Sequence, residues 1–194
     1  MSSKKISTKT DRFYSAHHIL KQIAEDNLVK AETKEPGWFN CQFTAIALSS
    51  LTIEAFCNAV GKKVIHNWED FESCSPIAKT RLLCEHLDIT YDDSKEPWAS
   101  IIWLSKIRNR IAHPKAESIT QNAVMTQEEH SKQKFRDTPK SKLEKEITPG
   151  NAKKSVAAVN QMIDLFCEKL TPGQSFGVIG DMWSSSASAH NSAN

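Results

Sequence analysis

An arginine and a histidine near the middle of the chain are side chains that together can act on a phosphodiester. Arg108 and His113 stand five residues apart in the segment IRNRIAHP at residues 107–114. A guanidinium stays charged at physiological pH and can bind a phosphate through two parallel hydrogen bonds. An imidazole exchanges protons near neutral pH. The pair therefore predicts acid–base chemistry at a phosphate, with no metal site and no cofactor.

Arg108 also breaks the pattern of the helix that we expect at residues 98–112. At about 100° per residue, Arg108 falls within the apolar arc that includes Leu104 and Ile111. Lys106 and Arg110 fall on the side where solvated charges belong. A guanidinium on an apolar face needs a carboxylate or a phosphate as its partner.

A thin polar strip runs along the long apolar segment at residues 38–61 and supplies a candidate partner. Ser50, Glu54 and Asn58 are spaced four residues apart, so they share one face of a helix. Because an unpaired carboxylate there would be destabilising, we expect Glu54 to pair with Arg108. Two interpretations stay open: a structural ion pair between helices, or a carboxylate that orients Arg108 for a ligand.

His113 is expected to leave the helix because Pro114 follows it. A residue before proline is biased away from helical geometry, so His113 can turn toward the cleft that Arg108 faces. The C-terminus of the helix also favours a protonated imidazole. The alternative is a histidine that caps the helix end and does no chemistry.

These residues resemble the motif of HEPN domains, which are all-helical bundles that include many ribonucleases. That motif is an arginine and a histidine separated by four to six residues, commonly with a polar residue after the arginine. Here Asn109 follows Arg108, and four residues separate Arg108 from His113. The same spacing occurs at residues 12–17 and 81–86, but there no asparagine follows the arginine and no proline follows the histidine.

The resemblance implies a metal-independent endoribonuclease that acts at the two-fold cleft of a homodimer. His113 of one subunit would take the proton of a ribose 2′-hydroxyl, and the second His113 would protonate the leaving 5′-oxygen. Arg108 would hold the scissile phosphate and stabilise its developing charge, supported by Asn109. Such enzymes are often toxins or antiviral effectors that an antitoxin or regulatory partner restrains.

Three further basic residues are candidates for contact with the RNA backbone. Lys106, Arg110 and Lys115 lie beside the motif, where they can neutralise phosphates. The alternative is that they are solvated surface charges.

Composition favours an all-α fold. The chain has 194 residues, 39% of them hydrophobic and 25% charged, with only 6 glycines and 7 prolines for turns. We expect a single antiparallel bundle of about five helices over residues 11–170, with no strand. Residues 114–149 form a long charged insertion, and residues 171–194 form a disordered polar tail.

Helical periodicity and boundary residues place the helices of this bundle. They are expected at residues 11–30, 38–61, 75–87, 98–112 and 151–170, with a short turn at 68–71.

The net charge, the cysteines and the apolar surface indicate the cellular compartment of the protein and the kinds of partner it can have. The net charge of +2 is too balanced to indicate nucleic-acid binding by bulk electrostatics. The five scattered cysteines suit a reducing cytoplasm, and the polar strip in the helix at 38–61 argues against a membrane span. Trp98, Ile102 and Trp103 spread apolar surface around one helix, which predicts that it dimerises.

Two other classes of function remain open at this stage. One is a non-catalytic helical interaction or regulatory module in which Arg108 and Glu54 are structural and the insertion binds a partner. The other is a nucleotide-binding regulator.

Overall fold

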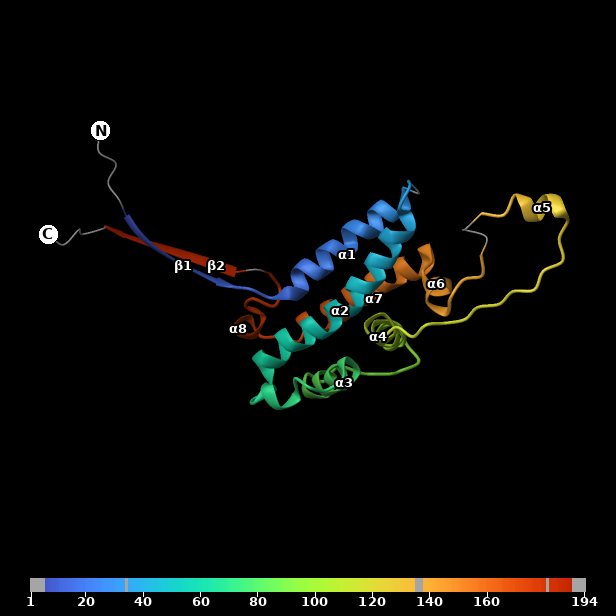
Figure 1. The fold of residues 1–194 in the computed structure, drawn as a ribbon. Coiled ribbons are helices and arrows are strands. Elements are labelled where there is room, and N and C mark those ends of the chain that lie inside the picture. The colour runs from blue at the N-terminus through green and yellow to red at the C-terminus, as the bar shows by residue number, and fades with distance from the viewer. Residues whose placement is uncertain (1–5, 34, 135–137, 181, 190–194) are drawn as a thin grey trace, which may run out of the picture.

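The computed structural model describes residues 6–33, 35–134, 138–180 and 182–189. The chain forms a helical body, from which a two-stranded ribbon projects on one side and a long excursion on the other (Figure 1). The elements are β1 (Ile6–Phe13), α1 (Ala16–Glu32), α2 (Trp38–Val64), a 3₁₀ turn (Trp68–Phe71), α3 (Pro76–His86), α4 (Trp98–Ala112), α5 (Gln127–Ser131), α6 (Lys142–Glu146), α7 (Pro149–Cys167), α8 (Pro172–Ser175) and β2 (Met182–Ala189).

Helix α2 is the centre of the body and packs against α1, α3, α4 and α7. Its buried residues include Ile46, Ile53 and Phe56, which have no exposed surface. A helix apolar on several sides is stable only when neighbours cover those sides, and four helices do so here. Within the described residues, α2 is also the one helix long and apolar enough to cross a membrane, and 50% of its most apolar window is buried inside the fold.

The structure moves the end of α2 beyond residue 61, where the predicted helix ends and where the glycine Gly61 stands. The helix continues to Val64. A Cβ atom at Gly61 would lie 2.3 Å from the ring of Trp68, which is itself 1% exposed. The glycine therefore serves close packing inside the helix, and it does not terminate it.

Several predicted boundaries are confirmed because the capping residues act as expected. Ser75 accepts a hydrogen bond from the backbone N–H of Ala78 (3.2 Å), and α3 begins at Pro76. Helix α4 spans 98–112 as predicted. Helix α7 begins at Pro149, two residues before the predicted start, because Thr148 caps it.

The two strands correct the expectation of an all-α fold. Residues 6–13 and 182–189 pair antiparallel, from Ile6 opposite Ala189 to Phe13 opposite Met182. The predicted helix start at Asp11 is therefore wrong, since Asp11 lies in β1 and α1 begins at Ala16. The tail is likewise not disordered throughout, because it contains α8 and β2. Its residues 190–194 lie outside the described part.

The insertion at 114–149 is exposed for most of its described length, as its composition indicates, but its last part rejoins the body. Ile147 is buried, and Leu143 packs against the core. Glu146 accepts hydrogen bonds from Trp103 Nε1 (2.6 Å) and from Arg110 Nη1. These hydrogen bonds hold α6 against α4, the helix that carries the motif.

Candidate functional site

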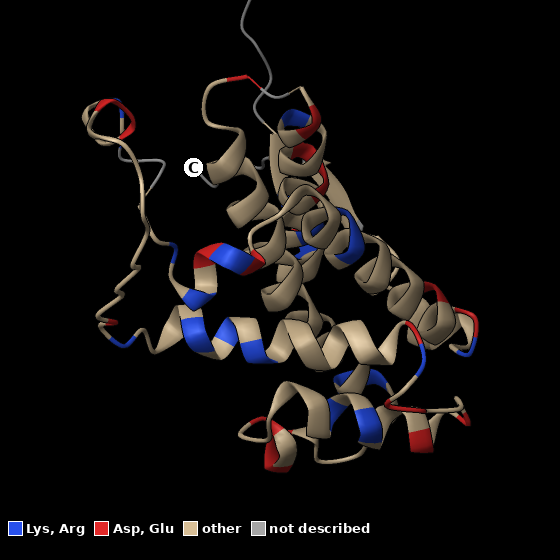
Figure 2. Cartoon of the chain, turned by 90° about the vertical axis from the view of Figure 1, so that its right-hand side faces the viewer, with Lys and Arg blue, Asp and Glu red and all other residues tan. Residues whose placement is uncertain are grey.

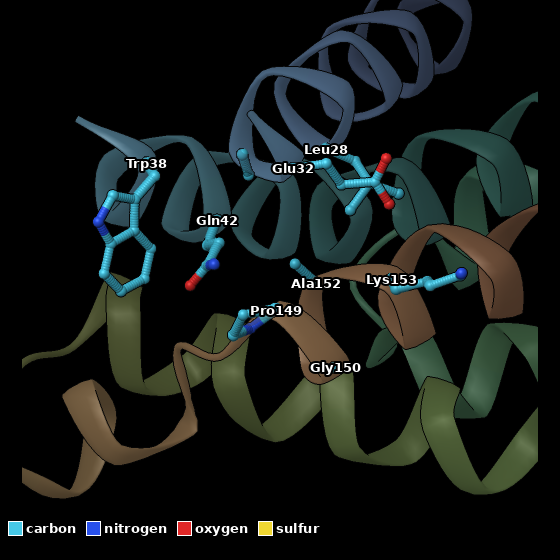
Figure 3. Close-up of a pocket in the computed structure, with 9 residues that line it drawn as sticks. Leu28, Glu32, Trp38, Gln42, Pro149, Gly150, Ala152 and Lys153 are labelled. Carbon is cyan, nitrogen blue, oxygen red and sulfur yellow. The ribbon is translucent and has the colours of Figure 1, made fainter. Parts of the chain in front are cut away.

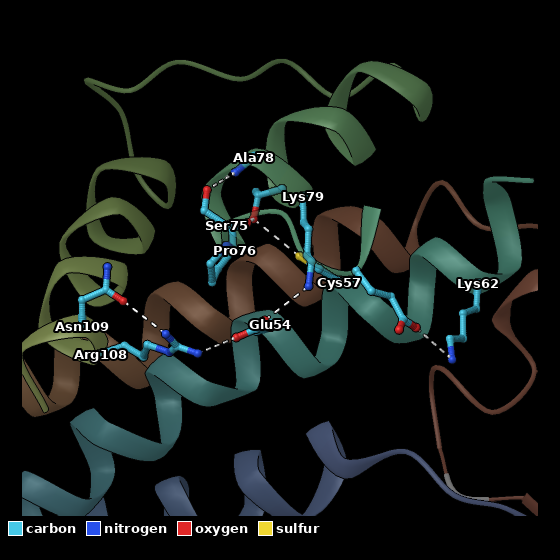
Figure 4. A network of polar contacts seen from close by, with 11 residues as sticks. Glu54, Cys57, Lys62, Ser75, Pro76, Ala78, Lys79, Arg108 and Asn109 are labelled. Atoms are coloured by element: carbon cyan, nitrogen blue, oxygen red, sulfur yellow. Dashed lines mark hydrogen bonds and ion pairs between the residues drawn. The ribbon is translucent and has the colours of Figure 1, made fainter. Parts of the chain in front are cut away.

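The expected ion pair between α2 and α4 is present, and it belongs to a larger cluster (Figure 4). Arg108 Nη2 donates to Glu54 Oε2 at 3.2 Å, and Lys79 Nζ of α3 donates to Glu54 Oε1, also at 3.2 Å. One carboxylate therefore serves two cations, which leaves one positive charge uncompensated within the cluster. That charge favours the approach of an anion.

Lys79 is a member of this cluster that sequence reasoning missed. Its side chain has no exposed surface, although lysine is almost never fully buried without a partner. The available signal was its position: Lys79 lies four residues before the buried Leu83 and three after Pro76, on the inner face of α3. The adjacent thiol is inert, because burial raises the pKa of Cys57 to about 11.

Arg108 lies at the edge of the body, and it is not enclosed in the apolar face where the helical wheel puts it. About 31% of its side chain is exposed, and it lines a groove of about 280 Å³ with α2 residues such as Ser50 and Leu51. Its Nη1 donates to Asn109 Oδ1 at 3.2 Å. The hydrogen bonds described here use two of its five N–H groups, so donors remain for a ligand.

His113 forms the C-terminal cap of α4 and is exposed. Its backbone has left helical geometry (φ −128°, ψ 61°), as the proline after it predicts. It lines a second pocket of about 770 Å³, whose far wall is built by the insertion at residues 115–119 and 141–143. The long segment after Pro114 therefore forms one wall of a pocket beside the histidine, which its charge pattern alone did not indicate.

The structure brings these residues to one end of α4 but not into one pocket. Arg108 opens onto the groove beside α2, whereas His113 opens onto the pocket beside the insertion. Asn109 connects the two, because it lines the His113 pocket and accepts the hydrogen bond from Arg108. In the described part of the chain, no hydrogen bond or ion pair joins Arg108 to His113 directly.

The three predicted RNA-contacting residues differ in availability. Lys106 and Lys115 are exposed, and Lys115 lines the His113 pocket. Arg110 is held by Glu146 of α6. Lys142, which was not singled out from the sequence, stands in the same pocket. Figure 2 shows basic residues gathered toward the C-terminal end of α4 and the adjoining α6, where the helix dipole also favours cations.

Among the described residues, no group of three or more histidine, cysteine, aspartate or glutamate side chains is placed to hold a metal ion. The chain matches no family model, and no curated protein and no solved structure is significantly similar to it.

Proposed function

We propose that this protein is a metal-independent endoribonuclease of the HEPN type that acts as a homodimer. The observation that carries the proposal is the state of Arg108, a partly exposed guanidinium that shares the carboxylate of Glu54 with the buried Lys79. A purely structural arginine would be fully matched by its counter-ion. This one keeps charge and hydrogen-bond donors at the surface, five residues from an exposed histidine.

The residues divide the chemistry of RNA cleavage between them. A neutral His113 takes the proton of the 2′-hydroxyl, and the 2′-oxygen attacks the phosphorus atom. Arg108 binds the phosphate oxygens and stabilises the added charge of the transition state, while Asn109 fixes its orientation. The 5′-oxygen leaves with a proton from a second, protonated His113. The products are a 2′,3′-cyclic phosphate and a 5′-hydroxyl end.

The dimer supplies what one chain lacks. Because Arg108 and His113 open onto different pockets of the same chain, a cleft that uses both needs a second copy placed against the C-terminal end of α4. Lys106 and Lys115 would then contact the RNA backbone on either side. We further propose a cytoplasmic toxin or antiviral effector, held in check by an antitoxin or regulatory partner.

A non-catalytic interaction module is the second candidate, and the ion pair itself favours it. Arg108 does bind Glu54, as a structural role requires. In that case the insertion would be the partner-binding element, and substitution of His113 would have no effect on RNA.

The deciding experiment is RNA cleavage by purified wild-type protein, His113→Ala and Arg108→Ala, with the product ends identified. We expect cleavage that survives EDTA and leaves 2′,3′-cyclic phosphates. His113→Ala should lower the rate by about 10²–10⁴-fold because proton transfer is lost. Arg108→Ala should lower it by a similar factor because transition-state charge is no longer stabilised.

Matched controls separate catalysis from folding and contamination. His86→Ala removes a histidine that ends α3 away from the motif and should cleave like wild type. Equal activity in all variants, or strict dependence on Mg²⁺, would assign the cleavage to another site or a contaminant. A wild-type protein without activity on any RNA would favour the interaction module.

A further inference from the structure

A pocket of about 500 Å³ lies on the other side of α2, away from the Arg108 groove. Three helices meet there: the end of α1, the beginning of α2 and the beginning of α7 (Figure 3). Its walls are mainly apolar, formed by Leu28, Ala31, Trp38, Pro149 and Ala152. Its volume lies within the range of small-molecule sites, about 300–1,000 Å³.

Glu32 and Lys153 also line the pocket, but Figure 3 shows their charged ends lying away from Gln42. Gln42 is the uncharged polar side chain of the lining. Gln42 is 1% exposed, and its Oε1 has no hydrogen-bond partner among the described residues. Figure 3 shows its amide pointing from α2 into the pocket toward Pro149. A buried acceptor without a donor is destabilising, so a ligand that donates to it would relieve that penalty.

An aromatic wall stands beside the amide. Trp38 begins α2 and is 42% exposed, so one part of its indole ring is open to the pocket and to solvent. Aromatic rings pair in offset or edge-to-face arrangements with other rings. The ring of Trp38 and the acceptor of Gln42 thus fit a flat, mainly apolar ligand that carries a hydrogen-bond donor.

We propose that this pocket binds a small aromatic heterocycle that carries one N–H group. The ring lies against Trp38 and the apolar wall, and its N–H donates to Gln42 Oε1. Gln42 Oε1 is covered in the ligand-free structure, so a hydrogen bond to it requires the side-chain amide to rotate as the ligand enters. The site is independent of Arg108 and His113, so it does not rest on the nuclease assignment.

Indole and 1-methylindole are the probes that test the proposal, because a methyl group replaces the N–H donor in the second. Binding is measured by NMR titration of the ¹⁵N-labelled chain, with the side-chain amide of Gln42 as the reporter. We expect saturable binding of indole and about fivefold weaker binding of 1-methylindole, the value of one hydrogen bond. In Gln42→Leu, this preference for indole should disappear.

Two glycine variants control for the location of the site. Gly150 and Gly173 each follow the proline that begins a helix, and a Cβ at either would meet no atom within 4 Å. Only Gly150 lines the pocket. Gly150→Phe should therefore abolish binding of both probes, while Gly173→Phe should leave binding unchanged.

Three outcomes would overturn the proposal. The first is equal binding of the two probes by the wild-type chain, or no saturable binding of either. The second is undiminished binding by Gly150→Phe. The third is binding of N-acetyltryptophanamide far more tightly than indole, which would assign the pocket to a side chain of a protein partner.

Discussion

At the scale of single residues, the most deeply buried charge of the cluster belongs to Lys79, which touches no substrate in the proposed mechanism. Lys79 has no exposed side-chain surface, and Glu54 is the acidic partner that the structure gives it. Arg108, which shares that carboxylate, is about a third exposed and can exchange its partner for water. The ion pair of Glu54 with Lys79 of α3 is therefore structural. The ion pair of Glu54 with Arg108 of α4 can break and form again. Loss of Glu54 should act on folding mainly through Lys79.

Glu54→Gln should lower the free energy of unfolding by about 3 kcal/mol, because it leaves the Lys79 ammonium buried without a counter-ion. Lys79→Met, which fills the same space without a charge, should lower it by less than about 1.5 kcal/mol. The double variant should recover most of the loss caused by Glu54→Gln. Urea denaturation of the three variants measures these differences. Additive losses in the double variant would mean that the two side chains are not coupled.

A buried thiol beside the same cluster predicts how stability depends on pH. Burial raises the pKa of Cys57 to about 11 from a usual value of 9.0. The folded chain thus keeps this proton to a higher pH than the unfolded chain, so the stabilisation is complete below about pH 9 and is lost as the pH rises toward 11. The loss should reach roughly 2 kcal/mol. Cys57→Ser, which does not titrate there, should show a shallower decline in denaturation measured from pH 8 to 10.5.

At the scale of elements, α2 is the central helix because its neighbours cover it and because the ring of Trp68 can pack directly against Gly61. It contacts four long helices, and near its end Gly61 admits the ring of Trp68. The 3₁₀ turn at 68–71 can return over α2 because the glycine has no side chain. This turn leads the chain to α3, which carries Lys79 to Glu54. The packing at Gly61 therefore helps to position the site.

Gly61→Ala should destabilise the protein by about 2 kcal/mol, although alanine is the better helix former, because its methyl group would overlap the Trp68 ring. Gly150→Ala is the matched control. It lies in the first turn of α7 with open space around it, so the change should be neutral or stabilising by up to about 1 kcal/mol. Thermal unfolding followed by circular dichroism measures both. An unchanged midpoint for Gly61→Ala would contradict the packing argument.

At the scale of the whole molecule, the proposed dimer depends on the motif end of α4 more than on apolar surface. Trp98, Ile101 and Leu104 are buried within their own chain, and Trp103 is hydrogen-bonded to Glu146. The apolar surface around α4, which we expected from the sequence to be exposed for dimerisation, is thus largely covered by the chain itself. The support that remains for the proposed dimer is the separation of Arg108 from His113 in two pockets.

Light scattering at micromolar concentration should give about twice the chain mass of 21.8 kDa. If each cleft needs both copies of His113, an equal mixture of wild type and His113→Ala, after subunit exchange, should retain about a quarter of the undiluted activity. Independent sites would retain about half. A monomeric mass would exclude the two-fold cleft.

The sequence by itself determined the helical segments and the motif, because these depend on local signals. The caps at Ser75 and the proline after His113 set boundaries that the structure keeps. The four-residue spacing along α2 identified Glu54 as the partner of Arg108. The caps and the proline act within a few residues of the boundaries they predict. The Glu54–Arg108 pair joins residues 54 positions apart, and it was predictable because each residue is a charge on an otherwise apolar helical face.

Only the tertiary structure decided most of the other contacts between segments far apart in the chain. Residues 6–13 pair with 182–189 through their backbones, which leave no trace in the pattern of side chains. Lys79 meets Glu54 across 25 residues, and the insertion returns to line a pocket with His113 and to bind Arg110 through Glu146. A helical wheel shows which face a side chain occupies, but the neighbouring helix decides how much of it water reaches. For that reason Arg108 emerged as a partly exposed cation and Lys79 as the buried one.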